Sequence, residues 1–166
     1  SIAVQPDGKI ILAGGSDWEV SRTTLARFYP DGSLDSGFAP TVTTALGGPA
    51  RIDNVVLRAN GKLLNGGTFR LVNGQSRVGL AQLNSDGSLD TDFVPSADIT
   101  WNGTFALVPE GKVVASGFST NLELILVRLL PTGELDSSFE LEQLPVYECS
   151  EVGTNELQRS PKFIST

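Results

Sequence analysis

The residues best suited to do chemistry are aspartates that recur in three glycine-containing turns. They stand in DGSLDSGF (31–38), DGSLDTDF (86–93) and TGELDSSF (132–139). Carboxylate and carbonyl oxygens are the ligands that Ca²⁺ prefers, so these stretches are candidates for binding it. The dense Asp-x-Asp-x-Asp spacing of a dedicated calcium loop is absent, and the third stretch has Thr132 where the others have aspartate. We therefore interpret the aspartates as turn formers and expect neither a metal nor another cofactor.

Acid–base catalysis is the second chemistry that these side chains support. Most glycosidases work with two carboxyl groups, but no spacing among the 19 Asp and Glu residues singles out one pair. The chain has no histidine to activate a serine or its one cysteine, Cys149. It also lacks a P-loop, a G-x-G-x-x-G loop and metal-binding Cys/His spacing. A non-catalytic protein is favoured, and a carboxylate-dependent hydrolase or lyase acting on glycans stays open as the alternative.

The composition limits the partners that the chain can have. Its 166 residues carry a formal net charge of −7, which repels nucleic acid and anionic membrane surfaces. No apolar stretch is long enough to cross a bilayer as a helix. With 40 % hydrophobic and 19 % charged residues, the composition is typical of a globular protein. One cysteine cannot form an intrachain disulfide, so the cysteine content does not indicate whether the protein occupies an oxidising or a reducing compartment.

A repeated unit organises most of the chain. Gly-Lys pairs recur at intervals of 53 and 50 residues, beginning at Gly8, Gly61 and Gly111. Between each pair and the following aspartate-containing turn lies a similar stretch: LARF (25–28), LAQL (80–83) or LVRL (126–129). A period of about fifty residues is typical of propeller blades. We assign three repeats, at about 1–40, 50–95 and 99–139, and a C-terminal tail at 140–166.

Each repeat is predicted to be a set of antiparallel strands. Apolar residues alternate before the Gly-Lys turn, as at Ile2 and Val4, which indicates a strand with one buried face. A near-continuous apolar run follows, as at residues 10–12, and is typical of a strand covered on both faces. The Leu-Asp-x-x-Phe stretch is expected to close the unit as a fourth element, with its Leu and Phe pointing inward. No stretch has a sustained helical period, so the predicted fold class is all-β.

Residues at the repeated positions are expected to have structural roles. Turn glycines expected to need a positive φ are Gly8, Gly61, Gly111, Gly32, Gly87 and Gly133. Glycines expected at a bulge or a close backbone approach are Gly14, Gly67 and Gly117. Aspartates expected to hydrogen-bond the turn backbone are Asp35, Asp90 and Asp136, and the closing aromatics are Phe38, Phe93 and Phe139. The turn lysines Lys9, Lys62 and Lys112 are expected to share one structural role.

These combined markers resemble the delta-60 repeat family, whose units read similarly to AVQPDGKILVGG followed by RLNPDGSLDTSF. The first repeat has AVQPDGKIILAGG at 3–15 and LARFYPDGSLDSGF at 25–38, and the third repeat diverges most. The resemblance implies a β-propeller-like array, usually in bacterial secreted or surface proteins, and brings no established activity. Kelch propellers share the Gly-Gly pair after a strand. Each kelch blade also has a tryptophan near its end, and neither tryptophan of this chain stands at such a position.

Three blades do not close a ring, because propellers usually have four to eight. An open array leaves an apolar face at each end without a neighbour. Two copies that pair 3 + 3 would make a six-bladed homodimer with two-fold symmetry, which is the resolution we favour. Further blades of a longer chain are the second resolution. A third is that the tail, residues 140–166, caps the array, and the tail is also a candidate for a closing strand.

The loops that differ between repeats are the predicted recognition surface. In the first of them, Trp18 lies between Asp17 and Glu19, and an exposed aromatic beside carboxylates suits a glycan or a protein partner. Trp101, at the start of a strand, is expected at the edge of the core. We therefore predict a structural or interaction module that works through its loops. In the enzyme alternative, the catalytic carboxylates would line the propeller axis.

Overall fold

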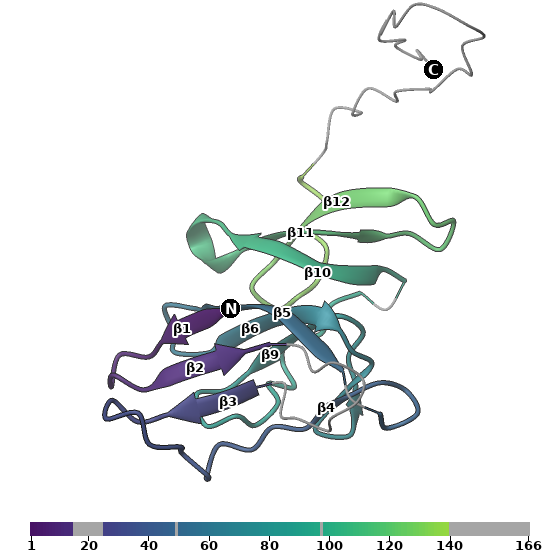
Figure 1. Ribbon diagram of the computed structural model, residues 1–166. Coiled ribbons are helices and arrows are strands. Elements are labelled where there is room, and N and C mark those ends of the chain that lie inside the picture. The colour runs from purple at the N-terminus through teal and green to yellow at the C-terminus, as the bar shows by residue number, and fades with distance from the viewer. Residues whose placement is uncertain (15–24, 49, 97, 140–166) are drawn as a thin grey trace, which may run out of the picture.

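The computed structural model describes residues 1–14, 25–48, 50–96 and 98–139 (Figure 1). These residues form an all-β fold, as predicted, and their single helical segment is the 3-10 turn η1 (Pro109–Gly111). In this described part of the chain, no helix combines the length and the apolar character that crossing a membrane requires.

The described strands form four antiparallel sheets of three strands each. The first repeat sheet consists of β1 (Ile2–Val4), β2 (Ile10–Ala13) and β3 (Leu25–Phe28). The second repeat sheet consists of β5 (Arg51–Leu57), β6 (Leu63–Thr68) and β9 (Leu80–Leu83). The third repeat sheet consists of β10 (Thr100–Leu107), β11 (Val113–Phe118) and β12 (Leu124–Leu129). A smaller sheet, the inserted sheet, consists of β4 (Val42–Thr43), β7 (Leu71–Val72) and β8 (Gln75–Ser76).

Each repeat sheet is a meander whose middle strand pairs with both others. The β1–β2 hairpin closes where the amide of Gln5 donates to the carbonyl of Lys9, at 2.8 Å. Gly8 in this turn has a φ of 83°, a conformation that a Cβ would make unfavourable. The third repeat closes a turn of the same length, from Val108 to Lys112, with a different geometry, since both Glu110 (φ 63°) and Gly111 (φ 71°) are left-handed. The turn geometry therefore varies, although the glycine keeps its place.

A glycine near the end of the second strand lies opposite a bulge in two of the three repeats. The β5–β6 register shifts between Ile52 and Asn54, and a Cβ at Gly67 would lie 2.1 Å from the Arg51 carbonyl oxygen. The β10–β11 register also shifts, and a Cβ at Gly117 would lie 2.6 Å from the side chain of Ile99.

The first repeat differs from the other two at this glycine. A Cβ at Gly14 would meet no described atom within 4 Å. The counterpart of Arg51, the residue that approaches Gly67, would precede Ser1, so the close approach at Gly14 stays a prediction.

The fourth element of each repeat is a single β-bridge rather than a strand. The bridges join Phe28 to Leu34, Leu83 to Leu89 and Leu129 to Leu135. Leu89 is buried, whereas Leu34 and Leu135 are exposed, so the prediction of inward-pointing leucines is correct only for the middle repeat. The middle sheet has a neighbour on both faces, and each outer sheet has one such neighbour among the described residues.

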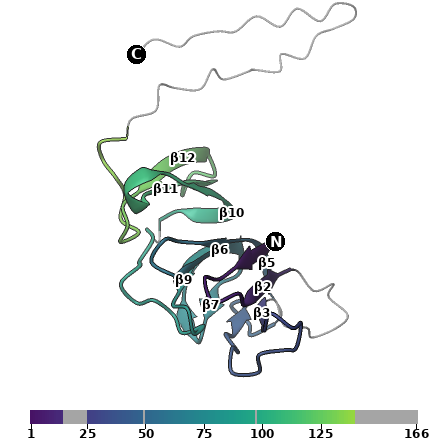
Figure 2. The same cartoon turned by 90° about the vertical axis from the view of Figure 1, so that its left-hand side faces the viewer.

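The three repeat sheets follow one another face to face, and a hydrophobic core fills each of the two spaces between them (Figures 1 and 2). Successive residues of β6 point into opposite cores: Leu63 faces the first sheet, and Leu64 faces the third. The apolar run of β6 is therefore buried on both faces, as predicted. The same prediction is wrong for β2, where Leu12 is exposed on the outer side of the stack. In β11 the apolar pair is Val113, which is buried, and Val114, which is half-buried.

Candidate functional site

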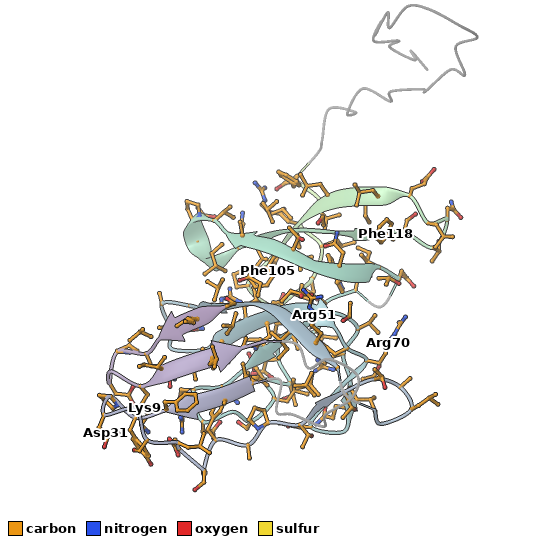
Figure 3. All side chains as sticks on the ribbon, viewed as in Figure 1. Lys9, Asp31, Arg51, Arg70, Phe105 and Phe118 are labelled. Carbon is orange, nitrogen blue, oxygen red and sulfur yellow. The ribbon has the colours of Figure 1, made fainter. Side chains whose placement is uncertain are left out.

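A charged cluster recurs at the end of each repeat sheet where its two turns meet. In the first repeat, Asp35 accepts a hydrogen bond from Arg27 Nε at 2.9 Å and lies 3.4 Å from Lys9 Nζ. In the third repeat, Asp136 accepts from Arg128 Nε at 2.8 Å, and its distance to the turn lysine is 3.3 Å. Figure 3 labels Lys9 and Asp31, one from each of the two turns, at this end of the first sheet. The turn lysines thus share a structural role, as expected.

The second repeat builds the same cluster with a different arginine. Gln82 occupies the position of Arg27 and donates to Asp90 at 2.5 Å, and Lys62 Nζ donates to the same carboxylate at 2.9 Å. The positive charge comes instead from Arg58, which is buried and donates to the Gln82 side chain and to the carbonyl of Gly111. This arginine therefore links the second repeat sheet to the first turn of the third.

Each aspartate of the clusters also orders the chain that follows it. Asp35 accepts a hydrogen bond from the amide of Gly37 at 3.1 Å, and the carboxylates of the other two repeats accept equivalent bonds. The aromatic residue that ends the unit packs against the arginine, as where Arg27 lies 4.5 Å from the ring centre of Phe38. A cation over a ring face is attracted by its quadrupole. The clusters therefore close each repeat, and their carboxylates are bound by groups of the protein itself.

The environment of the three carboxylates lowers their pKa. Burial by itself raises the pKa of Asp35, but the hydrogen bond and charge of Arg27 outweigh it. Burial likewise raises the pKa of Asp90, and hydrogen bonds from Lys62 and Gln82 reverse the shift. The pKa of Asp136 lies far below its usual range, chiefly because of the hydrogen bond from Ser138. All three side chains are therefore ionised at neutral pH.

We expect the protein to lose stability in acid because of these carboxylates. Their folded-state pKa values lie below the ordinary 3.8, so the unfolded chain takes up protons first as the pH falls. The stabilisation is complete above that value and is lost as the pH drops through the lowered values. Urea unfolding at several pH values will show a steady midpoint above about pH 5 and a falling one below about pH 4. A midpoint that rises in acid would contradict this assignment.

The other turn aspartates serve their own turns. Asp31 accepts hydrogen bonds from the amide and hydroxyl of Ser33, at 2.9 and 2.7 Å, and Asp86 does the same with Ser88. Hydrogen bonds from the serine are the main reason why the pKa of each of these two aspartates is lowered. Within the described residues, no group of three or more His, Cys, Asp or Glu side chains converges as a metal ligand set.

Among the first strands of the repeat sheets, β1, β5 and β10, β1 packs on β5, whereas β10 packs mainly on β6. These three first strands carry one described carboxylate, Asp53, which pairs with Arg51 on the same strand. The residues singled out for ligand contact, Asp17, Trp18 and Glu19, lie outside the described residues, as does Cys149. Trp101 is buried in the core between the second and third sheets.

A pocket opens beside the inserted sheet, where the second and third repeat sheets meet. Its volume is about 450 Å³, and its walls are mostly apolar. Phe69 and Trp101 form part of the wall with their side chains buried, whereas Leu46 and Arg70 stand exposed at the rim. Figure 3 shows Arg70 pointing away from the body of the protein on this side.

The inserted sheet that frames the pocket was not expected from the sequence, which marks residues 69–79 only as a variable loop. An Asn73-Gly74 turn joins β7 to β8, with φ values of 48° and 77°. Asn-Gly between two short apolar-containing segments is a strong hairpin signal, and it was the clue available. Pairing of β4 with β7 joins residues 42–43 to 71–72, a long-range contact that local patterns do not reveal.

Successive antiparallel sheets that bury cores between their faces, with one turn cluster per repeat, define a propeller-type repeat protein. Residues 5–38, 58–93 and 109–139 match the family described as "Domain of unknown function (DUF5122) beta-propeller", and the chain belongs to that family. The three matched segments begin and end close to the repeated turns and closing phenylalanines. No curated protein and no solved structure matches the chain.

Proposed function

We propose that the protein is a non-catalytic interaction module, a β-propeller of delta-60 repeats whose three repeat sheets are blades and whose loops bind a protein partner. The observation that carries the proposal is the pocket beside the inserted sheet. The repeat sheets share their turns and clusters. The inserted sheet joins β4, which lies between the first and second repeats, to the β7–β8 hairpin of the second repeat, and the described residues contain no second sheet of this kind. A feature that one repeat adds to a common scaffold suits a specific contact better than a structural need.

The chemistry of the pocket favours a peptide segment over a glycan. Glycan sites present exposed aromatic faces, whereas Phe69 and Trp101 are buried in the wall. The exposed groups are Leu46, which is apolar, and Arg70, a donor that pairs well with a carboxylate. A partner segment with one apolar side chain next to an acidic residue would meet both groups.

Selection from a peptide display library against the purified chain tests this proposal. We expect the selected peptides to combine an apolar anchor with Asp or Glu. Arg70→Glu and Leu46→Asp should each weaken their binding at least about tenfold, because both side chains are exposed and replacing them leaves the fold intact. Leu122→Asp, an exposed leucine away from the pocket, is the matched control. Peptides that bind the pocket variants as well as the unmodified chain would refute the proposal.

The enzyme alternative makes a different prediction, because a hydrolase or lyase would place its carboxylates near the axis. Asp53 on β5 is the described candidate, and its partner Arg51 holds it in an ion pair. Glycan cleavage that is abolished by Asp53→Asn and unaffected by Arg70→Glu would favour the enzyme over the binding module.

A further inference from the structure

On one face of the first repeat sheet, apolar residues are exposed, whereas their equivalents in the other two repeats are buried. Ile2 is 66 % exposed, whereas Val55 and Phe105, at the same repeat position, are 3 % and 8 % exposed. Leu12 on β2 is 44 % exposed, and its equivalent in the third repeat, Ala115, is 2 % exposed. The second and third sheets bury this face against the sheet before them. No described residue covers this face of the first sheet, and we call it the leading face.

The opposite face shows the reverse pattern at the other end of the stack. Leu126 on β12 is 37 % exposed, whereas Leu25 and Leu80, at the same repeat position, are 0 % and 1 % exposed. Phe118 and Leu124, which pair at the end of the third sheet, are exposed too. We call this face of the third sheet, which no described residue covers, its trailing face. The first and second sheets bury their trailing faces against the leading face of the next sheet.

Polar contacts between sheets show the same difference between covered and uncovered faces. Arg27 on β3 reaches across to the second sheet and donates to the Ser85 carbonyl, in the turn after β9. Arg128 occupies the position of Arg27 in the third repeat. It is bound to Asp136 and Ser138 of its own repeat, and its NH1 has no hydrogen-bond acceptor among the described residues. The trailing face thus has both the apolar residues and the arginine of an inter-sheet interface.

The end of one repeat also covers a turn glycine of the next repeat. A Cβ on Gly87, in the second turn of the second repeat, would meet Phe38 at 3.0 Å, and one on Gly133 would meet Val94 at 2.9 Å. In both cases the covering residue belongs to the end of the preceding repeat. The equivalent Gly32 of the first repeat has no described atom within 4 Å. Among the described residues, nothing occupies at Gly32 the place that the end of a preceding repeat fills at Gly87 and Gly133.

We propose that the uncovered faces are occupied by a second copy of this chain. The trailing face of each copy packs on the leading face of the other, so that two identical interfaces close a ring of six sheets. A second copy offers both faces, and the internal contacts between the first and second and between the second and third sheets show that they fit. Six sheets lie within the usual range for closed propellers, and two identical contacts related by a two-fold axis satisfy every face.

Light scattering after gel filtration of the full chain tests the proposal. The expected mass is near twice 17.6 kDa. Leu12→Asp on the leading face and Leu126→Asp on the trailing face should each give a monomer, because both would bury a charge in both interfaces. Leu46→Asp, an exposed leucine at the pocket, is the control and should stay dimeric. Circular dichroism will show that all three variants fold.

Mixing the two variants sharpens the test. One copy with Leu12→Asp and one with Leu126→Asp still share one undamaged interface, so the mixture should regain dimer that neither variant forms alone. A monomeric unmodified chain would overturn the proposal, as would a dimer that Leu126→Asp leaves intact. A mass that keeps growing with concentration would show open head-to-tail stacking and overturn the closed ring.

Discussion

Replacing Gly67 by alanine is expected to destabilise the fold by about 3 kcal/mol or more. The new Cβ would lie 2.1 Å from the Arg51 carbonyl oxygen and 2.8 Å from Ile52 Cα, and both are backbone atoms that cannot rotate away. Relieving the clash requires the β5–β6 bulge to open. That bulge lies next to the core that joins the first two repeat sheets, where Ile52 is buried.

Gly14→Ala is the matched control, because Gly14 occupies the same repeat position with no described atom within 4 Å of the new Cβ. We expect a change within about 0.5 kcal/mol, or a slight gain from the lower entropy of the unfolded chain. Urea unfolding followed by circular dichroism measures both variants. Equal midpoints for the two would show that the close approach at Gly67 has no energetic weight.

Asp90→Ala is expected to cost about 3 kcal/mol. The carboxylate is buried and accepts hydrogen bonds from Lys62 Nζ and Gln82 Nε2, and the buried guanidinium of Arg58 is close to the same cluster. Removing the carboxylate leaves these cations without their counter-charge. Because Arg58 also donates to Gly111, we expect the contact between the second and third repeat sheets to weaken as well.

Asp92→Ala tests whether this cost belongs to the cluster, since Asp92 is an exposed carboxylate only two residues away. Its change should stay within about 0.5 kcal/mol. A double-mutant cycle with Lys62→Ala isolates the coupling between Lys62 and Asp90. Additive effects of the two replacements would mean that the ion pair does not stabilise the protein.

Much of the architecture was predictable because it depends on short-range chemistry. The Gly-Lys turns, the all-β class and the hydrogen bonds of the turn aspartates follow from backbone preferences within a few residues. Repetition strengthened these predictions, since a pattern that occurs three times is unlikely to be chance. The family match then placed the repeats in a propeller family.

The candidate site was much less predictable. The ligand contacts predicted at Trp18 lie outside the described residues. The pocket lies beside a hairpin whose Asn73-Gly74 turn is a signal in the sequence, although the prediction treats residues 69–79 as a loop. The sequence also did not indicate that Arg58 supplies the arginine of the second cluster, where Gln82 stands at the position of Arg27. Arg58 stands on the strand side of the first turn, far in sequence from Asp90, and only the fold brings them together.

The sequence alone determined the repeat length, the turns and the alternation of each strand, because these reflect preferences of adjacent residues. The tertiary structure decided which faces are covered. Leu25, Leu80 and Leu126 are the same residue type at the same repeat position, yet the first two are buried and the third is exposed. Burial depends on whether another sheet lies opposite, and no property of the leucine or its neighbours in the chain contains that information.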